Sequence, residues 1–421
     1  MKKHTFTTIL ISSLAFSMFV SGCNMSSHQS DKKNSVSKEK VTLSLWGAQE
    51  DAELLRTMIS SFKKNYESKA DIEVTISPES ELTCKNTVLA NPKAAGDVFT
   101  FAEDQFDELV QAGALLPITE DTDQIIESCG GRDSAAIEAV TSDDGKLYAY
   151  PATSSNGYFM FYNSKYFHKQ DVTSLDQMLK IAAKNQKKVT MDFTSGWYIY
   201  SFFKGAGLDV YKDHASNVNV CNWNATDTKY TGVDVLNSML AIAKNPGFSG
   251  ATDEEFVEGI KDGSIIAGIS GTWNAKVVQD KFGDDFAACK LPTFTLKGDQ
   301  VQMHSVVGFK EVGVNAYSKQ PVWAQRLAAW ITNEENQKLR FKERGEAPAN
   351  KAAAATKEVQ DSPAIAALSK QSKFGHIQKV TESYWTPVSR MGIIILAGNS
   401  KNKDLQQLLD KTVEQIQKPA K

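Results

Sequence analysis

The fold of this chain is decided by the stretch Val41-Thr-Leu-Ser-Leu-Trp46 and by the residues that follow it. Apolar and polar side chains alternate from Val41 to Trp46, which is the pattern of a strand with one buried face. After Glu50 the apolar residues return with the period of a helix, at Leu54, Leu55, Met58, Ile59 and Phe62. A strand followed directly by a helix is typical of the beginning of an α/β layer.

Further strand and helix units follow. Residues 72–76 alternate as a strand, residues 97–101 form a short apolar strand, and a helix predicted over 104–112 ends at Gly113, a residue suited to a left-handed cap. Repeated units of this kind predict a largely parallel sheet. Because ligands bind beyond the carboxyl ends of the strands in such sheets, we expect the loops at 46–50 and 101–104 to face a binding crevice.

Length and charge limit the possible functions. A chain of 421 residues is too long for one ordinary core, so at least two domains are expected. The formal net charge of −3 offers no attraction for nucleic acid. From Val41 onward, no run approaches the roughly 20 apolar residues that a membrane-spanning helix needs.

The first residues predict export and lipid attachment. Lys2 and Lys3 precede an uncharged stretch that is too short to span a membrane and has the length of a secretory signal. This stretch ends in Val20-Ser-Gly-Cys23, which resembles the bacterial lipobox, whose cysteine receives diacylglycerol. We therefore expect a signal peptide over 1–22, acylation of Cys23 and a polar tether over 23–40. The alternative is an uncleaved signal anchor.

A series of short motifs runs through the rest of the chain in a fixed order. They are Ala95-Gly-Asp-Val98, Phe106–Gly113, Leu116-Pro-Ile118, Gly145–Pro151, Asn156–Asn163, Ile269-Ser-Gly-Thr-Trp273, Leu291-Pro-Thr-Phe294, Gly345–Asn350 and Tyr384-Trp385. Together they make the chain from Val41 to about Gln417 resemble the extracellular solute-binding proteins of sugar importers, the branch that contains the maltose- and maltodextrin-binding proteins.

The resemblance implies an α/β fold of the two-lobed periplasmic-binding-protein type (type II-like), with the ligand cleft between lobes joined by hinge strands. We place the N-terminal lobe at 41–152 and 309–348, and the C-terminal lobe at 153–308 and 349–421. The chain would cross between the lobes near 151–155, 306–308 and 347–350. The function implied is capture of an oligosaccharide by hinge closure.

Trp273 is the first candidate for ligand contact. A pyranose ring has an apolar face and a rim of hydroxyl groups, so it binds an aromatic plate together with planar polar side chains. Trp273 follows an apolar strand and a glycine-containing turn, a position that exposes an indole at the carboxyl end of a strand, and it matches a stacking tryptophan of the family. Packing in a core is the alternative.

Other aromatic and polar candidates come from the resemblance alone. The aromatic candidates are Trp385, Tyr384, Trp197 and Tyr198, and the polar ones are Asp104, Glu103, Gln49, Glu50 and Asn156. Core packing is the alternative for the aromatic residues, capping of the next helix for Asp104, and stabilisation of a helix start for Glu50. Gln105 stands where maltose binders often have a basic residue, which weakens the case for maltose itself, and Asn156 stands where the best-known member of the family has a glutamate. The ligand that the resemblance implies is a maltodextrin-like or related oligosaccharide.

Four cysteines remain beyond Cys23: Cys84, Cys129, Cys221 and Cys289. An even number outside the cell suggests disulfides, and four cysteines allow three pairings. Because a bridge between two moving lobes would lock them, we expect Cys84 to pair with Cys129 and Cys221 with Cys289. Free buried thiols are the alternative.

The predicted function is therefore binding without catalysis. We expect a monomer that is held on the outer face of the cell membrane through Cys23 and delivers an oligosaccharide to the transmembrane subunits of an ABC permease, with no cofactor or metal. A surface glycosidase would need two carboxylates flanking a bond, and the adjacent Glu103 and Asp104 point apart. The same fold could instead carry a peptide or a polyamine, which would call for carboxylate clusters or an arginine clamp.

Overall fold

The computed structural model describes residues 38–213, 216–377 and 379–419. Cys23 and the predicted signal peptide lie outside these residues, and so does most of the predicted tether. The first strand already begins at Glu39, so the last two residues assigned to the tether belong to the fold. Residues Glu39–Lys421 form one compact unit.

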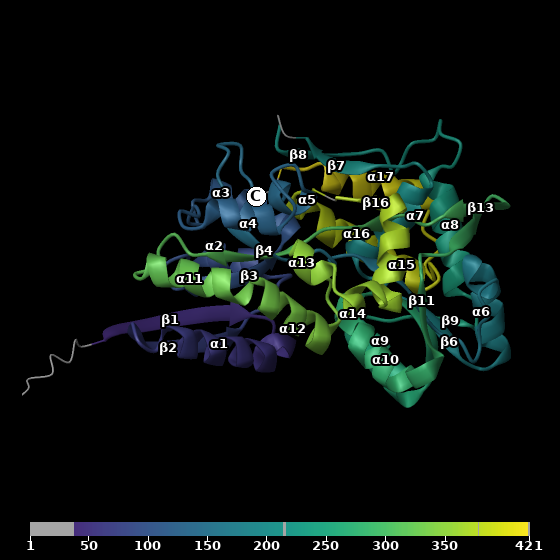
Figure 1. The fold of residues 1–421 in the computed structure, drawn as a ribbon. Helices are drawn as coiled ribbons and strands as arrows, with labels where there is room; N and C mark the ends of the chain where they lie inside the picture. The colour runs from purple at the N-terminus through teal and green to yellow at the C-terminus, as the bar shows by residue number, and fades with distance from the viewer. Residues whose placement is uncertain (1–37, 214–215, 378, 420–421) are drawn as a thin grey trace, which may run out of the picture. The chain divides into compact units, whose positions relative to one another are not determined.

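Two five-stranded sheets organise this unit (Figure 1). The first has the order β2-β1-β3-β15-β4 and the second β11-β5-β10-β6-β9. The strands of the first sheet are β1 (Glu39–Gly47), β2 (Ala70–Pro78), β3 (Val98–Ala102), β4 (Ala149–Thr153) and β15 (Lys310–Val314). Those of the second are β5 (Tyr158–Asn163), β6 (Lys188–Met191), β9 (Phe248–Gly250), β10 (Ile265–Gly271) and β11 (Phe286–Cys289). Short two-stranded sheets pair β7 (Val210–Asp213) with β8 (Val218–Cys221), β12 (Thr293–Leu296) with β13 (Asp299–Gln302), and β14 (Ser305–Val306) with β16 (Gly375–His376).

In each large sheet, four of the five strands run the same way and one is reversed. β15 is antiparallel to both β3 and β4, and β5 is antiparallel to both β10 and β11. Each reversed strand follows a passage of the chain from one sheet to the other. The reversed strand begins at the end of the sheet where the other four strands finish, so it is antiparallel to them. The largely parallel sheets predicted from the sequence are therefore present, each with one returning strand.

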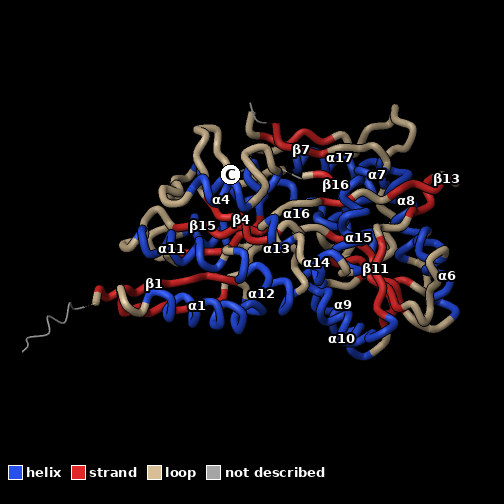
Figure 2. Tube along the Cα trace, in the orientation of Figure 1, coloured by secondary structure: helices blue, strands red, loops and turns tan. Residues whose placement is uncertain are grey.

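Helices cover both sheets (Figure 2). Around the first sheet lie α1 (Ala52–Tyr66), α2 (Cys84–Ala90), α3 (Phe106–Gln111), α4 (Thr122–Ser128), α5 (Ala135–Glu138), α11 (Pro321–Ile331), α12 (Glu334–Arg344) and α13 (Lys351–Ala354). Around the second lie α6 (Leu175–Lys184), α7 (Gly196–Gly205), α8 (Gly232–Ala243), α9 (Asp253–Asp262), α10 (Ala275–Phe282), α14 (Lys357–Gln360), α15 (Pro363–Gln371), α16 (Trp385–Leu396) and α17 (Leu405–Ile416).

Each sheet has its own apolar core. In the first, Leu45 and Phe99 of the sheet pack with Leu55 of α1 and Leu327 of α11. In the second, one core holds side chains of α7, α8 and α16, and a smaller one lies between β5, α9, α10 and α15. The helix that follows β1 buries Leu54, Leu55, Met58, Ile59 and Phe62, the five residues whose spacing predicted it. We call the parts built on the first and second sheets lobe 1 and lobe 2.

Candidate functional site

Three segments of the chain that connect the lobes are held together by hydrogen bonds. The backbone N–H of Ser154 donates to the carbonyl of Ala347 at 2.9 Å, and the N–H of Ala347 donates to Oγ of Ser155 at 2.9 Å. The N–H of Asn156 donates to the carbonyl of Gly308 at 3.1 Å. Asn156 is thus buried among these connections, where it lines a cavity of about 210 Å³ together with Gly157, Val307 and Leu368.

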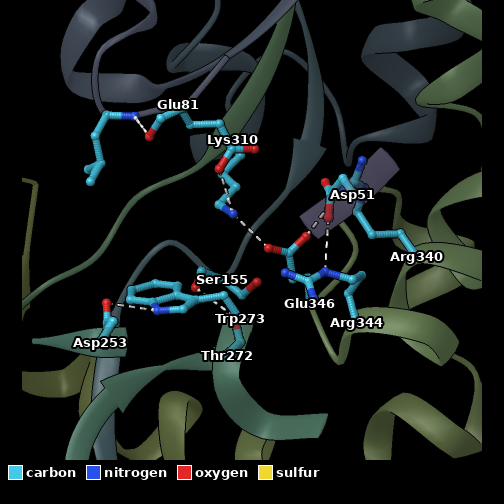
Figure 3. A network of polar contacts seen from close by, with 12 residues as sticks. Asp51, Glu81, Ser155, Asp253, Thr272, Trp273, Lys310, Arg340, Arg344 and Glu346 are labelled. Carbon is cyan, nitrogen blue, oxygen red and sulfur yellow. Dashed lines mark hydrogen bonds and ion pairs between the residues drawn. The ribbon is translucent and has the colours of Figure 1, made fainter. Parts of the chain in front are cut away.

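Trp273 lies where the two lobes meet. It stands in a single helical turn between β10 and α10, and it belongs to none of the apolar cores. The six-membered ring of its indole lies so close to Gly271 that a Cβ added there would lie 2.0 Å from a ring atom. On the lobe 1 side, the ammonium of Lys310 lies 5.9 Å from the centroid of the ring (Figure 3).

Asp253, the first residue of α9, fixes the indole in its plane. The indole Nε1–H donates to Oδ2 of Asp253 at 3.1 Å, and the hydroxyl of Ser270 donates to Oδ1 at 2.7 Å. The hydroxyl of Tyr198 and the amide of Asn274 donate to the same carboxylate. Burial raises the pKa of Asp253, although the hydrogen bond from Ser270 opposes this shift. The sequence carries no sign of this role, since Asp253 sits in an ordinary run of acids at a helix start.

A network of six charged side chains faces Trp273 from lobe 1 (Figure 3). Its members are Asp51, Glu81, Lys310, Arg340, Arg344 and Glu346. Lys310 Nζ lies 2.8 Å from Glu81 and 2.7 Å from Glu346. Arg340 contacts Asp51 and lies 3.0 Å from Glu346, while Arg344 lies 2.9 Å from Asp51. Three acids and three bases leave the network without net formal charge. Sequence analysis missed it because its members come from distant segments of the chain.

Opposite charges stabilise Glu346 and Lys310 in this network, whereas burial outweighs Lys310 at Glu81 and raises the pKa of that carboxyl. Burial alone would raise the pKa of Glu346, but Lys310 and Arg340 outweigh it and hold that pKa down to about 2. Burial would likewise lower the pKa of Lys310, but the carboxylates of Glu346 and Glu81 raise it well above its usual value. The ammonium of Lys310 is therefore a permanent charge beside the indole.

A second group of charges lies around two of the predicted acids. Glu103 is 6% exposed and accepts a hydrogen bond from the N–H of Phe309 at 3.1 Å. Burial raises the pKa of Glu103 to about 7, against the opposing charge of Lys379, and raises that of Asp104 to about 6, against Lys85. Asp104 makes no capping bond to α3, so that alternative is wrong.

Two ion pairs near these acids connect the lobes directly. Lys85 of α2 lies 3.1 Å from Glu108 of lobe 1 and 3.3 Å from Glu382 of lobe 2. Lys379 of lobe 2 lies 3.6 Å from Asp107 of α3. The lobes are thus in contact on this side as well as between Trp273 and Lys310.

The remaining predicted residues have different surroundings. Trp385 and Trp197 are partly buried and pack against the core of lobe 2. Tyr384 is 0% exposed and Tyr198 4%, and the hydroxyl of Tyr384 donates to the carbonyl of Gly196 at 2.8 Å. Both tyrosines therefore pack in the core of lobe 2, behind the surface that could meet a ligand. Gln49 and Glu50 are exposed in the turn before α1.

The predicted disulfides are absent, because Cys84, Cys129, Cys221 and Cys289 are free thiols. Cys84 and Cys129 are buried in the core of lobe 1, whereas Cys221 and Cys289 pack in and against that of lobe 2. Each acts as a small apolar side chain in its own place, and burial raises the pKa of all four thiols. An even count of cysteines was therefore misleading.

Neither a candidate metal site nor a candidate membrane-spanning helix is found among the described residues. Within residues 38–213, 216–377 and 379–419, no group of three or more His, Cys, Asp or Glu side chains could hold a metal ion. Over the same part of the chain, no helix combines the length and the apolar character needed to cross a bilayer.

Known proteins share this architecture. Residues 58–367 match the family described as bacterial extracellular solute-binding protein. The galactooligosaccharide-binding protein of Bacillus subtilis (strain 168) is 25% identical over 417 residues, covering 95% of this chain and 94% of the relative. A structure solved with acarbose is 30% identical with a TM-score of 0.79, covering 90% of this chain and 99% of that one. The maltodextrin-binding protein MalE1 from L. casei BL23, solved without ligand, is 25% identical with a TM-score of 0.72 and the same coverage. These matches confirm the predicted two-lobed fold, and this chain belongs to the family of bacterial extracellular solute-binding proteins.

Proposed function

We propose that this protein captures an oligosaccharide between its lobes and delivers it to the transmembrane subunits of an ABC permease. The observation that carries the proposal is the position of Trp273 between the lobes, with its indole N–H already bonded to Asp253 and one ring face turned toward lobe 1. An indole held in this way offers a flat apolar plate to the C–H face of a sugar ring. The names of the galactooligosaccharide- and maltodextrin-binding relatives support the same ligand class.

The proposed site uses residues of both lobes. Trp273, Trp385 and Trp197 would contribute aromatic surface, while Asp104, Gln49 and Glu50 would bond hydroxyl groups from lobe 1. Glu103, Asn156, Tyr198 and Tyr384 would act from behind this surface, since all four are buried. The proposal includes no chemical step on the sugar.

Hinge closure is the proposed mechanism. The proposed lobes are 41–152 with 309–348, and 153–308 with 349–421, except that α13 (Lys351–Ala354) packs with α12 of lobe 1. They are connected through the hydrogen-bonded segments around Ser154, Asn156 and Ala347. A sugar that contacts both lobes binds the closed form better than the open one, and this difference in affinity drives closure. We further propose that the protein acts as a monomer on the outer side of the cell membrane, held by the acylated Cys23, in keeping with the extracellular character of its family.

A calorimetric screen tests this function. The purified protein is titrated with neutral oligosaccharides of different linkage, a peptide mixture and a polyamine, and each mixture is checked for hydrolysis products. Saturable binding of a saccharide without turnover is the expected result. Binding of the peptide or the polyamine alone would refute the sugar proposal, and release of shorter saccharides would indicate a glycosidase.

A further inference from the structure

Lys310 has one N–H that its two ion pairs do not use. An ammonium carries three donors, and those of Lys310 reach Glu81 at 2.8 Å and Glu346 at 2.7 Å. No other acceptor among the described residues contacts this ammonium, which lies over the lobe 1 face of the Trp273 indole. The side chain of Lys310 is 13% exposed. A donor is therefore available at the position where a sugar ring on Trp273 would present its hydroxyl groups.

Glu81 offers an acceptor next to this donor. One oxygen of its carboxylate bonds Lys310, and the other has no hydrogen-bond partner among the described residues. Glu81 stands in the loop after β2, and its neighbour Leu82 is 84% exposed, so the loop borders on solvent. Neighbouring hydroxyl groups of a sugar ring both donate and accept hydrogen bonds, which matches an ammonium beside a carboxylate.

The rest of the charged network holds this pair in place. Glu346 contacts Lys310 with one oxygen and Arg340 with the other, and Arg340 contacts Asp51. The side chains of Glu346, Asp51 and Arg340 are no more than 6% exposed. Polar groups fixed before the ligand arrives lose little conformational entropy on binding, so they discriminate well between ligands.

We propose that Lys310 and Glu81 determine sugar specificity by bonding neighbouring hydroxyl groups of the ring that stacks on Trp273, and that the uncharged balance of their network selects a neutral sugar. The inference rests on the proposed function and adds two residues to its site. The charges of the network cancel, so an acidic or an amino sugar gains no net attraction there to offset the loss of its hydration, and either is disfavoured.

The spacing adds a condition on closure. A sugar ring stacks about 4 Å from an aromatic ring, and a hydrogen bond adds about 3 Å. The 5.9 Å between Lys310 Nζ and the ring centroid of Trp273 is shorter than this sum. A sugar ring held between these two groups would therefore set them about 1 Å further apart than this distance.

The test compares variants by calorimetry with one neutral oligosaccharide that the wild-type protein binds. Glu81→Gln and Lys310→Met are expected to weaken binding about 10- to 100-fold each, the range for loss of a charge-assisted hydrogen bond. Glu79→Gln and Lys276→Met are the matched controls, since the Glu79 side chain bonds Thr83 and Thr87 and Lys276 pairs with Asp280 on its own helix. Both controls should bind within about twofold of wild type, because neither side chain belongs to the charged network.

The outcomes separate this inference from the proposed function. If the wild-type protein binds no saccharide, both are refuted. If it binds and Trp273→Ala weakens binding while Glu81→Gln does not, the specificity role is refuted and the sugar function stands. Lys310→Met leaves Glu81 without its cation and Glu346 with Arg340 alone, so if that variant does not fold, Glu81→Gln decides the question. A uronic acid or an amino sugar counterpart that binds as tightly as the neutral chain would also overturn the inference.

Discussion

At the scale of single residues, the account depends on how firmly Trp273 is oriented before any ligand binds. Its six-membered ring lies against Gly271, Asp253 bonds its N–H, and the ammonium of Lys310 lies over the ring at 5.9 Å from the centroid. A side chain with so few remaining degrees of freedom costs little entropy to use in binding. It also contributes little to the apolar cores, since it lies outside all three.

Replacing Trp273 with alanine therefore separates binding from folding. We expect Trp273→Ala to weaken saccharide binding by about 2–4 kcal/mol, because the stacking surface is lost. Thermal unfolding of the sugar-free protein should change little. Isothermal titration calorimetry measures the binding, and differential scanning calorimetry measures the unfolding. As a control, Trp330→Phe removes the indole N–H that bonds Met58 at 3.1 Å and should lower stability while leaving binding unchanged. A large loss of stability in Trp273→Ala would mean that this indole is a core residue.

Glu103 predicts a pH dependence of stability. Burial raises its pKa to about 7 in the folded protein, above the ordinary value for a glutamate, so the unfolded chain loses this proton at lower pH than the folded protein. The stability linked to Glu103 is thus fully present below the unfolded pKa and is lost as pH rises through 7. Glu103→Gln should raise the free energy of unfolding at pH 8 relative to wild type by up to about 3 kcal/mol, with a smaller gain at pH 5.

Urea denaturation at the two pH values measures this difference. Glu50→Gln is the matched control, because Glu50 is exposed and should leave the pH dependence as in wild type. Equal effects of Glu103→Gln on the free energy of unfolding at pH 5 and pH 8 would contradict the raised pKa of Glu103.

At the scale of secondary-structure elements, the turn from β10 into α10 presents the indole. Gly271 has an extended backbone that alanine also adopts, with φ −97° and ψ 179°, but a Cβ at this position would meet the indole at 2.0 Å. Gly271→Ala should therefore displace Trp273 and weaken saccharide binding at least 10-fold, while the melting temperature falls by only a few degrees. Gly283→Ala, at the other end of α10, is the control for lost stability: φ 56° strains an alanine there, so the melting temperature should fall while saccharide binding stays unchanged. If Gly271→Ala binds saccharide as tightly as wild type does, the place that Gly271 gives to the Trp273 indole is not required for binding.

Local sequence patterns predicted the strands and helices that bury one face of their own. The β1 and α1 segments were predictable because alternating and helical periods record which face is buried, and the structure buries those faces. The left-handed helix cap predicted at Gly113 is also present, with φ 64°. Trp273 was found because a strand, a glycine and an aromatic residue stand together in sequence.

The partners of Trp273 could not be predicted because they come from distant segments. Lys310 meets Glu81 and Glu346 only after β15 has returned from lobe 2, and no local pattern records that meeting. Tyr198 and Tyr384 illustrate the same point, since proximity to a predicted site in sequence does not tell whether a side chain faces the cleft or the core. The cysteines show that a count cannot replace geometry.

At the scale of the whole molecule, the free thiols offer a direct check of the fold. Cys84, Cys129 and Cys221 are buried and Cys289 is partly so, which raises their pKa values and slows reaction with thiol reagents. We expect four reactive thiols, apart from Cys23, once the protein is denatured without reductant, and much slower labelling of the native protein. Fewer than four in the denatured protein would mean that disulfides form after all.

Lys85 connects the lobes and should influence their closure. Lys85→Met removes the pairs with Glu108 and Glu382, whose side chains are 33% and 52% exposed and so remain hydrated. The closed form loses a contact that the open form lacks, so the sugar-free protein should show a larger radius of gyration by X-ray scattering and bind saccharide more weakly. Lys338→Met, which breaks only pairs within α12, is the control. An unchanged radius together with unchanged affinity would show that this ion pair does not hold the lobes.

A crystal structure of the protein with a bound neutral oligosaccharide tests the central claim most directly. The account predicts a sugar ring parallel to the indole of Trp273 at about 4 Å, with hydroxyl groups bonded to Lys310 and Glu81 and the ammonium displaced from the indole. A saccharide bound elsewhere, or an indole that stays covered by Lys310 in the complex, would contradict it.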